Sequence, residues 1–202
     1  ALYHTMIAPY AYQDADGRYL GMDKKVHRAE PGYVNYSVFS LWDTFRALHP
    51  LMTIIQPERA ANWGKVLVQG YKEGGILPKW PLASSYTGCM VGYPAVSVLA
   101  DLATKDLAEG DLNVWAEAGA RSSVYRDDLA EKFKGTRELD LITRHPYYKE
   151  KYGFVPADSV PESVSWGLEM AYYDWCISQI AAKAGNTKLA KEYAAKAEYY
   201  KR

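Results

Sequence analysis

Residues 159–185, SVPESVSWGLEMAYYDWCISQIAAKAG, decide the fold class of this chain. Their apolar side chains recur at intervals of three and four, which predicts one long amphipathic helix ending at Gly185. Ser159 and Glu162 have the spacing of a capping box with Pro161 in the first turn, so we interpret Glu162 as a helix cap rather than a catalytic acid. Asp174 is either a buried carboxyl with a raised pKa or a partner of a tyrosine hydroxyl. The predicted buried stripe comprises Val164, Leu168, Ala171, Tyr172, Trp175, Cys176 and Ile180.

The remaining sequence has helical periodicity interrupted by loops of uneven length. Tyr33–Phe39 is predicted as a short strand or extended loop, and Ile76–Gly92 as a long loop of the kind that often carries function. We therefore predict an all-α fold of about six or seven helices. Besides the helix above, the expected helices are 42–56 with a kink at Pro50, 57–74 closed by Gly74-Gly75, 93–105, 112–125, 126–144, and a last one capped by Asn186 or Thr187.

Composition excludes several classes of function. The chain has 202 residues with 24 basic and 24 acidic side chains, so it has no net charge with which to attract nucleic acid. No apolar run is long enough for a membrane span, and the first ten residues lack the features of a signal peptide. Cys89 and Cys176 match no metal-binding spacing, and whether they pair is left open.

Familiar catalytic and metal motifs are also missing. The sequence Asp14-Ala15-Asp16-Gly17 begins like a calcium loop, but its later positions do not fit an EF-hand. There is no phosphate-binding loop, dinucleotide fingerprint, zinc-protease motif or nucleophile elbow. The four histidines are isolated from one another, which is typical of packed or surface residues.

Two aromatic and charged pairs are the candidate binding residues. The chain has 18 tyrosines and 6 tryptophans against 4 phenylalanines, an excess of rings with a polar edge that suits a sugar-binding cleft or simple helix packing. Asp43 follows Trp42, and Arg46 shares its helical face, so the two charged groups could hold a polyol or each other. A helix cap is the alternative role for Asp43. Lys79-Trp80 again joins a cation to a ring, and here the alternative is a loop anchor.

Several longer stretches resemble glycoside hydrolase family 92. The resemblance extends over nearly the whole chain, with the same order and spacing of motifs. Met170 and Tyr173 depart from it, because the family pattern has Tyr and Asp there. The matching stretches are HTMIAP (4–9), DGRYLGMD (16–23), YSVFSLWDTFRALHPLMTIIQPER (36–59), EGGILPKWPLASSYTGCMVGYPA (73–95), YGFVPAD (152–158) and ESVSWGLEMAYYDWC (162–176).

The resemblance implies a calcium-dependent, inverting exo-α-mannosidase, one that cleaves α-1,2 links in many members. It implies that residues 1–202 are the N-terminal part of one (α/α)6 toroid catalytic domain, preceded in the family by a β-sandwich domain. The motifs for the catalytic acid and base, and most calcium ligands, are expected C-terminal to Arg202, so no catalytic or metal residue is assigned in this chain. The substrate-binding residues implied are Trp42, Asp43, Arg46, Lys79 and Trp80.

The chain is accordingly expected to be an inactive fragment of an exported hydrolase that is periplasmic, secreted or on the cell surface. Its expected partner is an α-mannoside glycan, with no nucleic acid and no membrane. The fragment is also expected to self-associate through apolar faces left open in an incomplete toroid. The alternative from another class is a non-catalytic helical module that binds carbohydrate or protein.

Overall fold

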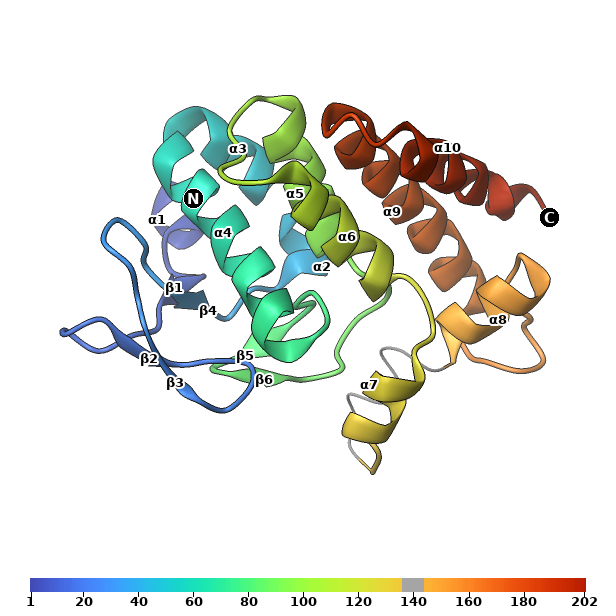
Figure 1. The fold of residues 1–202 in the computed structure, drawn as a ribbon, viewed down its shortest axis with the longest axis horizontal. Helices are drawn as coiled ribbons and strands as arrows, with labels where there is room; N and C mark the ends of the chain where they lie inside the picture. The colour runs from blue at the N-terminus through green and yellow to red at the C-terminus, as the bar shows by residue number, and fades with distance from the viewer. Residues whose placement is uncertain (136–143) are drawn as a thin grey trace.

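A computed structural model describes residues 1–135 and 144–202, and helices dominate its architecture (Figure 1). Helix α9 packs against α5, α6 and α10, and α10 lies at the outer edge of the molecule (Figure 1). No helix in the described residues is both long and apolar enough to cross a membrane. The helices are α1 (Leu2–Thr5), α2 (Leu41–Thr44), α3 (Leu48–Ile55), α4 (Pro57–Gly74), α5 (Ala95–Thr104), α6 (Leu112–Ser122), α7 (Asp127–Lys132), α8 (His145–Tyr152), α9 (Ser163–Lys183) and α10 (Thr187–Lys196), followed by a 3-10 turn (Ala197–Lys201).

Three small antiparallel sheets of two strands each correct the all-α prediction. They lie together at one side of the molecule, away from α10 (Figure 1). The fold is rich in helix, as predicted, but the polar stretch before residue 30 forms a hairpin that its short alternation did not reveal. The pairs are β1 (Tyr10–Ala11) with β4 (Tyr36–Ser37), β2 (Arg18–Leu20) with β3 (Val26–Arg28), and β5 (Pro81–Leu82) with β6 (Ser85–Tyr86).

Helix boundaries follow the local signals in some places. Pro57 begins α4, and Gly75, with φ of 88°, ends it, as predicted. The Asn186 side chain accepts a hydrogen bond from the Leu189 backbone N–H and so caps α10, also as predicted. Part of the weakly periodic region 126–144 is helical, as α7, while residues 136–143 of that prediction lie outside the described residues. Helix α8, which begins just after this region, is not predicted by the sequence.

Two local predictions are wrong. The single helix expected over 42–56 is two helices, α2 and α3, separated at Phe45–Ala47, and Pro50 lies in the first turn of α3 rather than at a kink. A proline costs little there because first-turn N–H groups have no partner within the helix. The capping box at Ser159 is also absent, since α9 begins at Ser163 and Ser159 Oγ donates to Asp158 instead.

Only part of the apolar stripe predicted on α9 is buried. Val164, Leu168 and Trp175 are 73%, 53% and 49% exposed. Cys176 and Ile180 are buried, as predicted. The helix is apolar on more than one face, so periodicity alone did not decide which face packs inward. The face that faces the core carries Trp166, Met170, Tyr173, Ile177 and Ala181.

Candidate functional site

A cleft of about 550 Å³ contains two of the predicted site residues, Trp42 and Lys79. Trp42 comes from α2, at the point where the extended segment after β4 turns into helix. Lys79 comes from the long loop between α4 and α5. The other lining residues are Gly88, Met90, Val91, Arg144, His145, Pro161, Glu162, Ser165 and Trp166.

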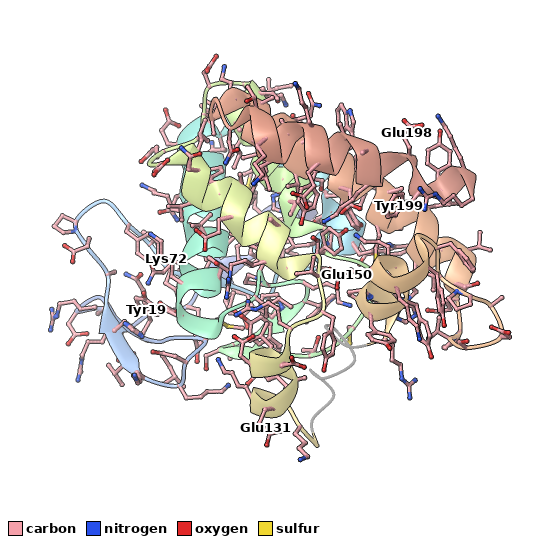
Figure 2. All side chains as sticks on the ribbon, turned by 45° about the vertical axis from the view of Figure 1, so that its right-hand side comes forward. Tyr19, Lys72, Glu131, Glu150, Glu198 and Tyr199 are labelled. Carbon is pink, nitrogen blue, oxygen red and sulfur yellow. The ribbon has the colours of Figure 1, made fainter. Side chains whose placement is uncertain are left out.

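A second hollow of about 610 Å³ lies between the β2–β3 hairpin and α4. Figure 2 labels Tyr19 and Lys72, which line it from the two sides. It contains none of the residues that the sequence singles out for binding, so the smaller cleft is the better candidate for the functional site.

The serine that precedes α2 joins Asp43 to Trp80. Trp80 Nε1 donates a hydrogen bond of 2.8 Å to Ser40 Oγ, and Ser40 Oγ in turn donates to Asp43 Oδ2. Asp43 is exposed and makes no capping hydrogen bond to the backbone of α2, so the cap interpretation is wrong. The contact keeps the carboxylate ready to accept hydrogen bonds, because a hydroxyl donor satisfies only part of its capacity.

Trp42 lies half-buried beside this network. Its indole Nε1 is buried and has no hydrogen-bond partner among the residues that the structure describes. The guanidinium carbon of Arg46 lies 5.1 Å from the centre of its ring. The indole is therefore an apolar surface with one unused donor.

Arg46 does not pair with Asp43, contrary to one of the two predicted arrangements. It reaches α9, where its Nη2 lies 2.7 Å from Glu169 Oε1. The hydroxyl of Tyr173 donates to the other oxygen of Glu169 at 2.5 Å. The hydrogen bond that Arg46 donates to Glu169 raises the pKa of Arg46 further, so the guanidinium keeps its charge at every working pH.

Lys79 is buried, with 3% of its surface exposed, and its ammonium donates to the Met90 carbonyl. Its Nζ also lies 5.0 Å from the centre of the Trp166 ring, a cation–π contact. Lys79 is therefore a loop anchor, which is one of the two interpretations. It also lines the cleft, as a binding residue would.

His145 and Trp166 form a wall of the cleft that sequence reasoning missed. Their rings stack with centroids 3.8 Å apart and planes at 9°. His145 Nε2 donates to the Pro161 carbonyl at 3.2 Å, and burial lowers the pKa of the ring, so it is neutral at pH 7. An isolated histidine carries no signal that could have placed it here, because its partner is 21 residues away on another helix.

The two acidic residues that the sequence singles out on α9 have different positions. Glu162 lies at the N-cap of α9, but its side chain makes no capping hydrogen bond; it is exposed, has a φ of 56° and lines the cleft. Asp174 is fully buried, away from the cleft, and accepts hydrogen bonds from Tyr93 and Lys149. Asp174 therefore bonds a tyrosine hydroxyl, as one of the two alternatives predicted. Cys89 is exposed, Cys176 is buried, and both thiols are free.

Comparison with known proteins places this chain in a family. The sequence profile of the glycosyl hydrolase family 92 catalytic domain matches residues 1–202. The structure of the family GH92 α-mannosidase BT3965 from Bacteroides thetaiotaomicron is 37% identical, with a TM-score of 0.83 over 98% of this chain. The same protein in complex with mannoimidazole gives a TM-score of 0.82 at 36% identity, covering 98% of this chain and 24% of that one.

The GH92 inverting mannosidase BT2199 from the same species is 31% identical, with a TM-score of 0.83 over 99% of this chain and 26% of that one. A search of curated proteins found no match. The chain belongs to glycoside hydrolase family 92. It spans about a quarter of the length of these solved relatives, since it covers 25% of BT3965.

Proposed function

We propose that the protein containing this chain is an exo-acting α-mannosidase that removes mannose from glycans, with α-1,2 links as the preferred substrate and with inversion at the anomeric carbon. The observation that carries the proposal is the cleft beside Trp42 and Lys79, next to the Ser40–Asp43–Trp80 network, in a chain of family 92. The solved relatives support it, since one is a complex with mannoimidazole and another is an inverting mannosidase.

The residues of this chain would bind and orient the sugar. The half-buried Trp42 ring offers an apolar face for pyranose C–H groups, while its Nε1–H is buried and faces no solvent. The exposed carboxylate of Asp43 can accept from two adjacent hydroxyls. Arg46 supplies a fixed positive charge at the edge of the same surface, and Trp80, through Ser40, holds Asp43 in place.

The acid and the base would lie outside residues 1–202. Inversion needs two carboxyl groups about 6.5–9.5 Å apart with a water molecule between them. Glu162 is the one carboxyl group that lines the cleft among the described residues, so this wall alone does not supply the pair. The chain therefore contributes positioning of the substrate rather than proton transfer.

An (α/α)6 toroid is the architecture we propose for the complete domain. Helices α9 and α10 run side by side and pack extensively, as hairpin pairs in such a ring would (Figure 1). The apolar residues Val164, Leu168 and Trp175 on α9 are exposed, and further helices of the ring would cover them.

Calcium is the proposed cofactor of the whole enzyme, with ligands mostly beyond this chain. Among the described residues, Asp23, His27 and Glu73 are the group whose ligand atoms lie close enough to hold a metal, within 4.8 Å of one another. This group does not fit calcium, because it offers an imidazole nitrogen where calcium takes oxygen ligands. None of the three lines the cleft, so no step of the reaction is assigned to a metal held by these residues.

The test is the stereochemistry of hydrolysis by the full-length protein. Proton NMR of an aryl α-mannoside digest should show β-mannose as the first product, and activity should fall when a calcium chelator is added and return with calcium. Retention of configuration would contradict an inverting mechanism. The non-catalytic alternative predicts no turnover at all, together with the absence of the family's acid and base motifs from the longer gene.

A further inference from the structure

Two opposite charges are completely buried between α8 and α9. Lys149 Nζ lies 2.8 Å from Asp174 Oδ2 and 3.0 Å from Asp174 Oδ1, so one ammonium contacts both oxygens. The side chains are 4% and 0% exposed. Glu150, the next residue of α8, is labelled in Figure 2 and is exposed, so α8 turns Lys149 inward against the usual preference of lysine for water.

A third residue, Tyr93, completes the cluster. Its hydroxyl donates to Asp174 Oδ1 at 2.5 Å and accepts from Lys149 Nζ at 2.9 Å. Lys149 Nζ also lies 5.4 Å from the centre of the Tyr93 ring. We call Tyr93, Lys149 and Asp174 the buried triad, and its members come from three segments that are distant in sequence.

Each of those three segments continues into the wall of the cleft. Tyr93 follows Met90 and Val91, which line it. Lys149 lies one helical turn after His145 on α8, and Asp174 lies about two turns after Trp166 on α9. The buried triad therefore links the loop, α8 and α9 by hydrogen bonds and an ion pair behind the lining of the cleft.

Lys79 connects these three segments to the surface of the cleft. Its ammonium is placed by the Met90 carbonyl from the loop and by the Trp166 ring from α9. The His145 ring from α8 stacks on the other partner, Trp166. A shift of the loop or of α9 would separate Lys79 from a contact that places it, and a shift of α8 would remove the ring that stacks on Trp166.

A buried ion pair is a poor source of stability, because the cost of removing two charges from water offsets their attraction. Its directional hydrogen bonds fix geometry instead, since a well-packed apolar pair of similar volume would tolerate sliding. We propose that the buried triad is a positioning device that sets the relative placement of the three cleft-lining segments and thereby the affinity for the sugar. This inference rests on the proposed function of the cleft.

The test separates positioning from stability in the full-length enzyme. Lys149→Met or Asp174→Leu alone leaves an unpaired buried charge and should lower the melting temperature. The double variant K149M/D174L removes both charges, so its melting temperature should return close to that of the wild type. Its KM should stay raised about 10- to 100-fold with a smaller change in kcat, because the displaced groups bind the sugar and include no acid or base. Lys151→Met, at an exposed lysine of α8, is the matched control and should change neither value.

A double variant that regains both stability and wild-type KM would overturn the inference. If the double variant stays unstable, Tyr93→Phe tests the proposal instead, because it keeps both charges and the ring and removes only the hydroxyl. The KM of this variant should rise, and an unchanged KM overturns the proposal. Hydrogen exchange of the variants should increase in segments 86–93, 144–148 and 163–167 and not elsewhere. Hydrogen exchange can be measured even if the wild type hydrolyses no mannoside, a result that would refute the proposed function alone. A uniform increase in exchange over the whole chain would refute the positioning role.

Discussion

The guanidinium of Arg46, in the turn between α2 and α3, and the carboxylate of Glu169 on α9 form an ion pair of 2.7 Å between residues 123 positions apart. Asp43, three residues from Arg46, lies in a different network. The pair ties the turn after α2 to α9, four residues beyond Trp42. It leaves Arg46 48% exposed, so one face of the guanidinium stays accessible beside the Trp42 ring.

Arg46→Ala should therefore affect binding more than stability. A pair this exposed contributes about 0–1 kcal/mol to folding, so the melting temperature should change little. If Arg46 contacts the sugar, KM should rise, whereas Glu169→Gln, which keeps Arg46 and a hydrogen-bonding partner, should have a smaller effect. Melting curves and steady-state kinetics of the two full-length variants check this, and equal KM values in both variants and the wild type would exclude Arg46 from the site.

Asp43→Ala should reduce transition-state binding by about 2–4 kcal/mol if the carboxylate bonds a sugar hydroxyl in a desolvated site. Stability should hardly change, because Asp43 is exposed and caps no helix. Ser40→Ala is the informative companion, since it removes the hydroxyl that links Asp43 to Trp80 and should cost less than the loss of the carboxylate itself. Normal turnover in Asp43→Ala, with lowered stability, would instead assign the residue a structural role.

His49 should make stability depend on pH. It is buried, between Phe39 and Trp63, and burial lowers its pKa from 6.5 to about 4. The unfolded chain therefore binds a proton more readily than the folded one, so the contribution is fully present above pH 6.5 and is lost as the pH falls towards 4. The loss amounts to about 3 kcal/mol over that window.

The measurement for His49 is the melting temperature of the enzyme between pH 7 and pH 4, compared with His49→Phe. Phenylalanine suits an aromatic surrounding and cannot take up a proton. The variant should lose stability less steeply with acid than the wild type, and parallel curves would show that His49 is not the group responsible.

Substitution by alanine should have opposite effects on thermal stability at two glycines within helices. At Gly70 of α4 a Cβ would lie 2.7 Å from Pro78 Cγ, a rigid ring just before Lys79, so Gly70→Ala should destabilise the fold and displace the loop. At Gly167 of α9 a Cβ would meet nothing within 4 Å, so Gly167→Ala should stabilise by about 1 kcal/mol through helix propensity. Thermal melting of both variants tests the pair, and stabilisation by Gly70→Ala would show that Pro78 yields.

The isolated 202-residue chain should self-associate through the exposed stripe on α9. Leu168 and Trp175 are half-exposed on one side of that helix, with Val164 one turn before Leu168, and apolar surface of this kind drives association. Sedimentation velocity should show oligomers that Leu168→Lys reduces, while Leu82→Lys, at an equally exposed leucine of β5, should not. A monomer at high concentration would contradict this expectation.

Local signals in the sequence determined much of the helical framework. The limits of α4 follow from Pro57 and Gly75, and the start of α10 follows from the Asn186 cap, because capping and backbone preferences act within one or two turns. The family motifs likewise lie in the sequence itself, and the matching profile over residues 1–202 bears them out. The roles assigned to the five predicted site residues stay predictions.

Contacts between distant segments decided the ion-pair partners and which side chains are buried. The sequence offered Arg46 a neighbour in Asp43, but packing of the turn after α2 on α9 gave it Glu169. Periodicity found α9 but not its buried face, because the helix is apolar on several sides and only its neighbours select one. No local pattern marks Lys149, whose burial depends on a carboxylate 25 residues away. Ion pairs and buried polar groups depend on which surfaces meet, a property of the folded chain that no local pattern encodes.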